Sequence, residues 1–340
     1  MIKKANYCNK NNRVEFVDLA KGICICLVVL LHVYGESAGN TFEILNMFRM
    51  PLYFVLSGLF FKPYSGFSSF AKKKVNKLLI PFLITYIVIC VPSILLFSKE
   101  MSLQSFWTID SLKPNLGLDG AAWFLLCLFF QNIIFYLIFK VSKHNIYIVI
   151  LFGIIIGYVG YSFNKNGANL PLWVDSAMTA MPYFLFGYIV KKYSSVLSDK
   201  MTLKYYSVII LSIIILLLCH YYNIYVNCNT IVFGENNFDV NIISLYLGGI
   251  SGFCLVFLVS KYINRIPIIS YIGRYSIVVL LTHLLYLFVI RNILYQLGAN
   301  QTSIVLNFFV FVFIMLISVP TINICIKYLP YWFAQKDLID

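Results

Sequence analysis

The chain has 340 residues, of which 61% are hydrophobic and 11% charged, and its mean hydropathy is +0.84. Because a soluble globular domain carries about 25% charged residues, this composition excludes an ordinary soluble protein. Lys and Arg outnumber Asp and Glu by 26 to 13, and in so apolar a chain we read this excess as marking the cytoplasmic side of a membrane, so we expect a polytopic membrane protein with no nucleic-acid partner.

Ten apolar runs of about the length that crosses a bilayer follow one another along the chain. They lie at residues 14–34, 45–62, 78–98, 121–140, 146–162, 175–191, 205–222, 241–260, 271–297 and 303–326. No stretch is left for a sizeable soluble domain. We therefore expect one all-α polytopic membrane domain over residues 1–340, with about ten transmembrane helices and a short basic tail at residues 1–13. The first run lacks a small-residue cleavage site, which predicts a retained span and not a signal peptide.

The distribution of basic residues predicts the orientation of this bundle. An even number of spans places both termini on the same side of the membrane, and basic residues gather in cytoplasmic loops. The exceptions are Lys99, Lys113 and Lys165 on the opposite side and Arg49 and Arg291 within spans. We therefore expect both termini to be cytoplasmic. The two longest loops of the other face, at about 99–120 and 223–240, form either a binding surface for a polar molecule or ordinary solvated loops.

The first span carries three ionisable side chains, which are costly inside a membrane and usually functional. Lys21 and His32 are eleven positions apart, so on a helix they differ in direction by about 20°, with Asp18 within about 60° of both. His32 lies roughly 16 Å deeper along the helix than Lys21. His32 is either a general base or a structural histidine that bonds a neighbouring helix. Asp18 and Lys21 are either functional or an interfacial pair.

Other spans contribute further candidates. Arg49 lies early in the second span, close to Pro51, and either reaches outward to the interface or orients an anionic or hydroxylated ligand. His283 and Arg291 lie eight positions apart on the ninth span, about 80° apart in direction, so they can face one cavity. The alternative for both is a bond to another helix.

A cluster of lysines precedes the third span. It consists of Lys72, Lys73, Lys74 and Lys77. Such a cluster either holds its loop in the cytoplasm and contacts anionic lipid, or binds a cofactor that is rich in phosphate. The cysteines are scattered, and Cys24 and Cys26 point to different faces of a helix. We expect no metal site, because no metal-binding spacing is present. We also see no internal repeat and no pair of broken spans, both of which mark many transporters.

Several segments resemble, in order, the acyltransferase-3 family of integral membrane acyltransferases, and more closely its branch of fucose 4-O-acetylase-like proteins. They are Phe16-Val17-Asp18-Leu19-Ala20-Lys21-Gly22, His32, Arg49-Met50-Pro51-Leu52-Tyr53-Phe54-Val55-Leu56-Ser57-Gly58, Trp123-Phe124-Leu125, Met181-Pro182-Tyr183-Phe184-Leu185-Phe186-Gly187-Tyr188, Ile272-Gly273-Arg274-Tyr275-Ser276 and Thr282-His283. The resemblance covers essentially the whole chain. It implies ten spans and cytoplasmic termini.

The resemblance also implies a reaction. An acetyl or other short acyl group, not an amino-acyl group, passes from cytoplasmic acetyl-CoA or another acyl-CoA to a hydroxyl of a cell-surface glycan or a lipid-linked sugar. In the family a basic residue, commonly Arg, precedes the catalytic His by eleven positions, and these places hold Lys21 and His32. A second motif of two arginines is matched by Lys74 and Lys77. These lysines keep the positive charge but lose the planar two-pronged donor.

The resemblance gives the remaining candidates their expected roles. The lysines at 72, 73, 74 and 77 bind the phosphates of the acyl-CoA, with Lys21 continuing the positive path and Asp18 supporting it. His32 is the general base. Candidates for binding the sugar or stabilising the oxyanion are Arg49, Trp123, His283 and Arg291, and Trp123 is placed to stack on a sugar ring. The expected location is the bacterial cytoplasmic membrane, among its lipids.

Two other functions remain open at this stage. One is a transporter or flippase for a glycan or lipid intermediate, in which His32, Arg49 and Arg291 line a passage and no acyl group is transferred. The other is a structural partner that scaffolds a glycan-synthesis complex. Binding of acyl-CoA distinguishes the enzyme from the transporter, because a transporter is indifferent to the acyl donor.

Overall fold

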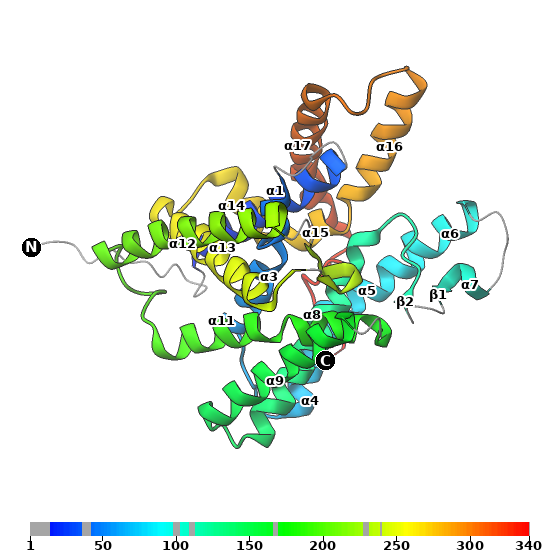
Figure 1. Cartoon of the computed structure of the whole chain (residues 1–340). Coiled ribbons are helices and arrows are strands. Elements are labelled where there is room, and N and C mark those ends of the chain that lie inside the picture. Colours follow the sequence, from blue (N-terminus) through cyan, green and yellow to red (C-terminus); the bar gives the residue numbers. More distant parts are fainter. Residues whose placement is uncertain are drawn as a thin grey trace, which may run out of the picture.

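The computed structural model describes most of the chain as helix (Figure 1). The residues it describes are 14–35, 42–97, 103–108, 113–165, 169–226, 231–238 and 240–339. The predicted basic tail at residues 1–13 and Lys99 therefore lie outside the described residues, and of Lys165 only the backbone is described.

Long helices make up the body of the protein. They are α1 (Glu15–Tyr34), α8 (Trp123–Val141), α9 (Ile146–Lys165), α12 (Leu203–Tyr221), α13 (Ile242–Ile263), α16 (His283–Gln296) and α17 (Ile304–Tyr328). The shorter helices are α2 (Glu43–Asn46), α3 (Arg49–Leu59), α4 (Phe67–Lys74), α5 (Ile80–Thr85), α6 (Val91–Phe97), α7 (Leu103–Phe106), α10 (Val174–Thr179), α11 (Met181–Tyr193), α14 (Pro267–Arg274) and α15 (Ser276–Leu280).

Short turns and strands complete the chain. Three segments are π-helical, namely η3 (Val75–Leu79), η4 (Tyr86–Cys90) and η7 (Tyr222–Val226). Three are 3₁₀ turns, namely η5 (Gly120–Ala122), η6 (Pro171–Trp173) and η8 (Phe233–Glu235). The strands form two antiparallel pairs, β1 (Trp107–Thr108) with β2 (Lys113–Pro114) and β3 (Ile231–Val232) with β4 (Asn237–Phe238).

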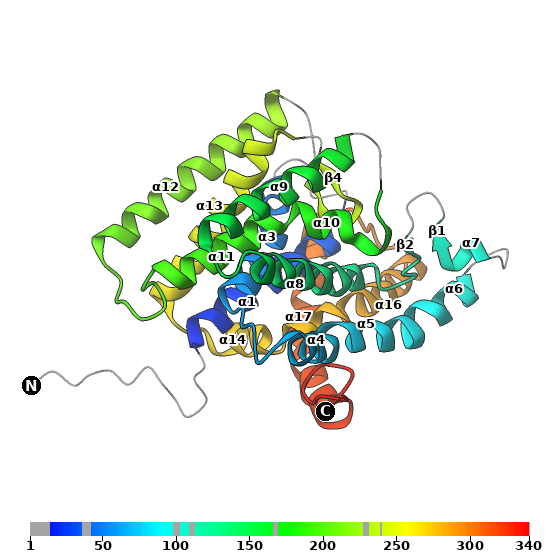
Figure 2. The ribbon, with the colours of Figure 1, turned by 90° about the horizontal axis from the view of Figure 1, so that it is seen from below.

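Eight helical stretches in the described part of the chain are long and apolar enough to cross a membrane. They are Glu15–Tyr34, Phe67–Phe97, Gly120–Val141, Ile146–Phe163, Leu203–Val226, Ile242–Ile263, Ser276–Gln296 and Ile304–Tyr328. These stretches coincide with eight of the ten predicted spans and confirm a mostly helical integral membrane protein. Figure 2 shows α8 crossing the middle of the bundle, between the group of α9 to α13 and the arm formed by α4 to α6.

The other two predicted spans, 45–62 and 175–191, fall on pairs of shorter helices, α2 with α3 and α10 with α11. Pro51 follows the first break, in the first turn of α3, and Pro182 follows the second, in the first turn of α11. Proline has no N–H to bond the preceding turn, so it is tolerated at the start of a helix and disrupts its interior. The prediction that no pair of broken spans exists is therefore wrong.

The two broken spans pack against each other through glycines. A Cβ atom added at Gly58 of α3 would lie 1.9 Å from the carbonyl oxygen of Phe184, and one added at Gly187 of α11 would lie 2.0 Å from that of Val55. The helix backbones are thus in direct contact, and no side chain larger than hydrogen fits between them. This contact fixes α3, which carries several candidate site residues, against α11.

We expect Gly187→Ala to destabilise the protein by about 1–3 kcal/mol, because the added methyl group forces two helices apart. The measurement is the midpoint of thermal unfolding in detergent, which should fall by several degrees. Gly120→Ala is the matched control, since a Cβ atom there meets nothing within 4 Å. Equal midpoints for the two variants would contradict the close packing of α3 and α11.

A second glycine contact holds α1 against α14. A Cβ atom at Gly22 would lie 2.1 Å from the carbonyl oxygen of Ile269, and one at Gly273 would lie 1.9 Å from the carbonyl oxygen of Asp18. The approach brings the carboxylate of Asp18 to 3.3 Å from Nε of Arg274. α1 also contacts α3, α13, α15 and α17, so this helix lies at the centre of the bundle (Figure 1).

Candidate active site

A cavity of about 280 Å³ lies between α1, α3, η3, α8 and α15. Its polar lining residues are Lys21, Tyr53, Ser57, Lys74 and Ser276, and its other walls are apolar side chains such as those of Phe60 and Phe124. Pockets that hold drug-sized ligands measure about 300–1,000 Å³. The cavity therefore fits a slender chain and is too small for a whole nucleotide.

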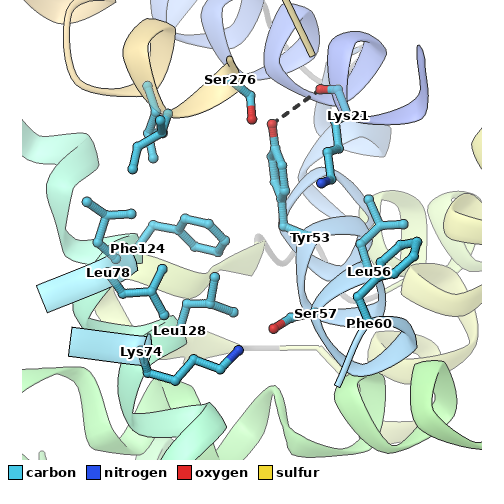
Figure 3. A pocket seen from close by; sticks show the side chains of 13 residues that line it. Lys21, Tyr53, Leu56, Ser57, Phe60, Lys74, Leu78, Phe124, Leu128 and Ser276 are labelled. Carbon is cyan, nitrogen blue, oxygen red and sulfur yellow. Dashed lines mark hydrogen bonds between the residues drawn. The ribbon is translucent and has the colours of Figure 1, made fainter. Parts of the chain in front are cut away.

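Two lysines from distant parts of the chain point into this cavity (Figure 3). Lys21 comes from the middle of α1, and Lys74 is the last residue of α4. The ammonium group of Lys21 lies 6.0 Å from the ring centre of Phe60, and that of Lys74 lies 5.5 Å from the ring of Phe70. An apolar cavity with two ammonium groups favours a ligand that is anionic at one end and apolar along its length.

Two hydroxyl groups that sequence reasoning missed, those of Tyr53 and Ser276, also line the cavity. The hydroxyl of Tyr53 donates a hydrogen bond to the backbone carbonyl of Lys21 at 3.2 Å and lies close to the side chain of Ser276 (Figure 3). Both residues stand inside the segments that resemble the acyltransferase-3 family. Because the sequence search selected only ionisable groups, it passed over these neutral ones.

The structure brings together three residues that the sequence singled out separately. The ring centres of His32 and His283 are 5.2 Å apart, with the ring planes at 46°. Arg49 lies close enough to act electrostatically on both rings. His32 is exposed, whereas His283 is only 1% exposed. We call His32, His283 and Arg49 the histidine cluster.

Two members of the histidine cluster lie close in the chain to residues that line the cavity. Arg49 precedes the cavity residue Tyr53 by four positions on α3, which is about 6 Å of helix rise. His283 follows the cavity residue Leu280 by three positions, after the chain leaves α15. The histidine cluster therefore lies near the cavity along the chain, four positions before Tyr53 and three positions after Leu280.

Two polar atoms in the histidine cluster are buried and find no hydrogen-bond partner among the described residues. They are Nε of Arg49 and Nε2 of His283. A buried polar group without a partner costs about 1–3 kcal/mol, so such atoms are rare unless a ligand or water completes them. Nε of Arg49 is a hydrogen-bond donor, and Nε2 of His283 is a donor or an acceptor according to the tautomer of the imidazole. This pattern is typical of a site that binds a polar group.

Asp18 and Arg291 hold helices together. The carboxylate of Asp18 is buried and pairs with Arg274, which links α1 to α14. The guanidinium of Arg291 donates to the backbone carbonyl of Val33 at 2.5 Å and to the side chain of Asn307 at 2.8 Å, which ties α16 to α1 and α17. These contacts match the helix-to-helix alternative for Arg291.

Trp123 lies at the first turn of α8, beneath the hairpin of β3 and β4. Its indole packs edge-on against Phe124, with ring centres 5.9 Å apart. A Cβ atom at Gly234 would lie 3.1 Å from its Nε1, so the loop rests directly on the indole. A buried ion pair of Lys113 with Asp175, at 3.5 Å, fixes neighbouring loop segments. Trp123 is half-buried and does not line the cavity of the lysines.

The four lysines that precede the third span have different surroundings, because the C-terminal segment, residues 329–339, pairs with two of them. Of the four, only Lys74 lines the cavity, and Lys72 is exposed. The ammonium groups of Lys73 and Lys77 lie 2.6 and 3.0 Å from the carboxylate of Asp337. Their hydrogen bonds hold the pKa of Asp337 below its ordinary value.

A buried asparagine secures this C-terminal segment. The side chain of Asn76 accepts hydrogen bonds from the backbone N–H groups of Leu338 and Ile339, at 2.7 and 2.9 Å, and donates to the carbonyl of Ile339 at 2.7 Å. Figure 2 shows the C-terminal end beneath α4. Asn76 is neutral, and Asp337 lies far from the lysines in the sequence. Neither was therefore predicted to interact with the lysine cluster.

The fold and the site define an integral membrane protein with a positively charged, apolar-walled cavity and a separate cluster of two histidines and an arginine. A family model described as an acyltransferase domain, that of the acyltransferase-3 family, matches residues 14–323. The chain therefore belongs to this family and is an acyltransferase. No curated protein and no solved structure matches the chain. The C-terminal segment that binds Lys73 and Lys77 lies beyond the matched residues.

Proposed function

We propose that this protein is a membrane O-acyltransferase that moves an acetyl or another short acyl group from cytoplasmic acyl-CoA to a hydroxyl of a cell-surface glycan or glycolipid. The observation that carries the proposal is the cavity with its two lysines, whose lining residues Tyr53 and Leu280 stand within four positions of Arg49 and His283 in the histidine cluster. The proposal includes about ten spans, cytoplasmic termini, a bacterial cytoplasmic membrane and a relation to fucose 4-O-acetylase-like proteins.

The donor end of the proposed reaction lies at the lysines. An acyl-CoA has a phosphate-rich nucleotide and a slender pantetheine arm, and the cavity dimensions suit the arm. Lys21 and Lys74 then provide point charges for phosphate oxygens at its mouth, while Lys72 is exposed nearby. Lys73 and Lys77 join them by exchanging the carboxylate of Asp337 for phosphate.

The acyl transfer itself takes place at the histidine cluster. His32 removes the proton from the acceptor hydroxyl as its oxygen attacks the thioester carbonyl. The new C–O bond forms, the C–S bond breaks, and the CoA thiolate leaves with the proton that His32 held. Arg49 stabilises the oxyanion with its unpartnered Nε–H, which needs an acceptor. Trp123 is the candidate for stacking on the sugar ring.

One observation favours the transporter alternative. Broken spans in the two halves of a chain often form transport sites, and α2 with α3 and α10 with α11 are such a pair. The two proposals differ in their response to the donor. Acetyl-CoA should bind the purified acyltransferase with an affinity that falls as salt is added, whereas a glycan transporter should not bind it.

The proposed function is tested on the surface glycans of cells that lack this chain and are complemented with the wild type or with His32→Ala. Mass spectrometry should find an acetyl-sized or other acyl-sized increment that vanishes in the deletion and returns only with the wild type. Unmodified glycans in every strain, with a reduced amount of surface glycan in the deletion, would reject acyl transfer in favour of transport.

A further inference from the structure

The base in the proposed function needs a second group to hold it. An imidazole accepts a proton only at a nitrogen that carries none, so its tautomer and ring orientation must be fixed. His32 is exposed on α1, and Asp18 on the same helix lies about 21 Å away by rise and pairs with Arg274. Any group that orients His32 must therefore come from another helix.

His283 is the side chain placed for this task. Its ring centre lies 5.2 Å from that of His32, and it approaches from the first turn of α16. The chain breaks between α15 and α16, where Thr282 has non-helical dihedral angles. This break turns the His283 ring back toward the carbonyl of Val279, one turn earlier.

The contact with Val279 determines which nitrogen of His283 carries the proton. Nδ1 lies 2.9 Å from the carbonyl oxygen of Val279. A carbonyl oxygen only accepts, so Nδ1 is the donor and, in the neutral ring, Nε2 is left as an acceptor. Nε2 is buried and has no hydrogen-bond partner in the described structure. It therefore needs a donor.

The available donor is an N–H of His32. Nε of Arg49 is also without a partner in the described ranges, but the proposed function assigns its N–H to the oxyanion. Hydrogen bonds of catalytic groups are often long or poorly aligned in unliganded proteins and tighten when substrate binds. Because the His283 ring is buried and bonded to Val279, the exposed His32 ring is the one that rotates to align the two imidazoles.

We propose that His283 is a positioning residue whose Nε2 accepts the N–H of His32 when the acceptor substrate binds. This inference rests on the proposed function. The bond leaves the other nitrogen of His32 unprotonated and facing the acceptor hydroxyl. That nitrogen receives the hydroxyl proton as the C–O bond forms and returns it to the CoA thiolate as the C–S bond breaks. His283 keeps its own proton on Nδ1 throughout.

Two substitutions test the role of Nε2 of His283 separately from that of Nδ1. His283→Asn keeps an amide donor near the position of Nδ1, so the bond to Val279 survives and the acceptor at Nε2 is lost. His283→Gln places an amide oxygen near the position of Nε2. We expect His283→Asn to lower kcat by about 100-fold, since misplacing a catalytic group by 1 Å costs about that much. His283→Gln should restore kcat to within about tenfold of the wild type.

The assay follows labelled acetyl groups from acetyl-CoA into the glycans of membranes from cells that lack the wild-type chain. The KM for acetyl-CoA should stay within about twofold in both variants, because His283 lies beyond the lysine cavity. Wild-type kcat in both variants, or equal losses with lowered thermal unfolding midpoints, would overturn the positioning role. If His32→Ala itself remains active, the proposed function fails and the inference fails with it.

Discussion

Replacing His32 by alanine should lower kcat for acyl transfer by about 10²- to 10⁴-fold, the usual contribution of a positioned general base. Without the imidazole of His32, the histidine cluster loses its exposed base, because His283 is only 1% exposed with its ring bonded to Val279, and Arg49 is cationic. Binding of acetyl-CoA should be unchanged, because His32 does not line the lysine cavity. Transfer of labelled acetyl and calorimetric titration with acetyl-CoA measure the two quantities.

His220→Ala is the matched control for this experiment. His220 is a half-buried histidine near the end of α12 and belongs to neither the cavity nor the histidine cluster. The His220→Ala variant should keep kcat within about twofold of the wild-type value. An active His32→Ala protein, or an equal loss of activity in His220→Ala, would show that His32 is not the base.

The double substitution Lys21→Gln with Lys74→Gln should weaken the binding of acetyl-CoA by at least about 100-fold. A hydrogen bond to a charged group contributes about 1.5–3 kcal/mol, and glutamine retains a donor but removes the charge. Both ammonium groups point into the cavity, so the loss should exceed that of either single variant (Figure 3). The salt dependence of the affinity should also become shallower, because screening acts on the charges that were removed.

The control for the double variant is Lys140→Gln with Lys192→Gln. Both residues are exposed lysines on the side expected to be cytoplasmic, and neither lines the cavity. This control removes the same net charge and should change the affinity for acetyl-CoA by less than about threefold. Comparable losses in both double variants would indicate a general attraction to positive charge and no site at Lys21 and Lys74.

Hydropathy and residue type were enough to predict eight of the spans, because each coincides with a long apolar helical stretch. They did not reveal the breaks before Pro51 and Pro182. The sequence around each proline remains apolar, so a hydropathy average passes over the break. The contacts of Gly58 with Phe184 and of Gly187 with Val55 depend on the tertiary arrangement, and nothing in the local pattern of either helix predicts them.

The sequence identified the single residues of the candidate site, but it did not predict which of them come together. Ionisable groups in spans stand out by their cost, which identified His32, Arg49 and His283 one by one. Their meeting depends on α1, α3 and α16 converging, and sequence spacing says nothing about helices so far apart in the chain. The same limit applies to His283 and Arg291, which the helical wheel directs toward one cavity. The wheel gives direction but not partners, and Arg291 bonds Val33 and Asn307 while His283 lies beside His32.

The most direct test of the central claim uses sealed membrane vesicles of both orientations and acetyl-CoA labelled in its acetyl group. We predict that inside-out vesicles, which expose the cytoplasmic face, transfer label to their glycan or glycolipid fraction. Vesicles of the opposite orientation should not, and neither should inside-out vesicles that contain His32→Ala. Absence of transfer by inside-out vesicles that contain folded wild-type protein and its native glycans would contradict acyl transfer from a cytoplasmic acyl-CoA.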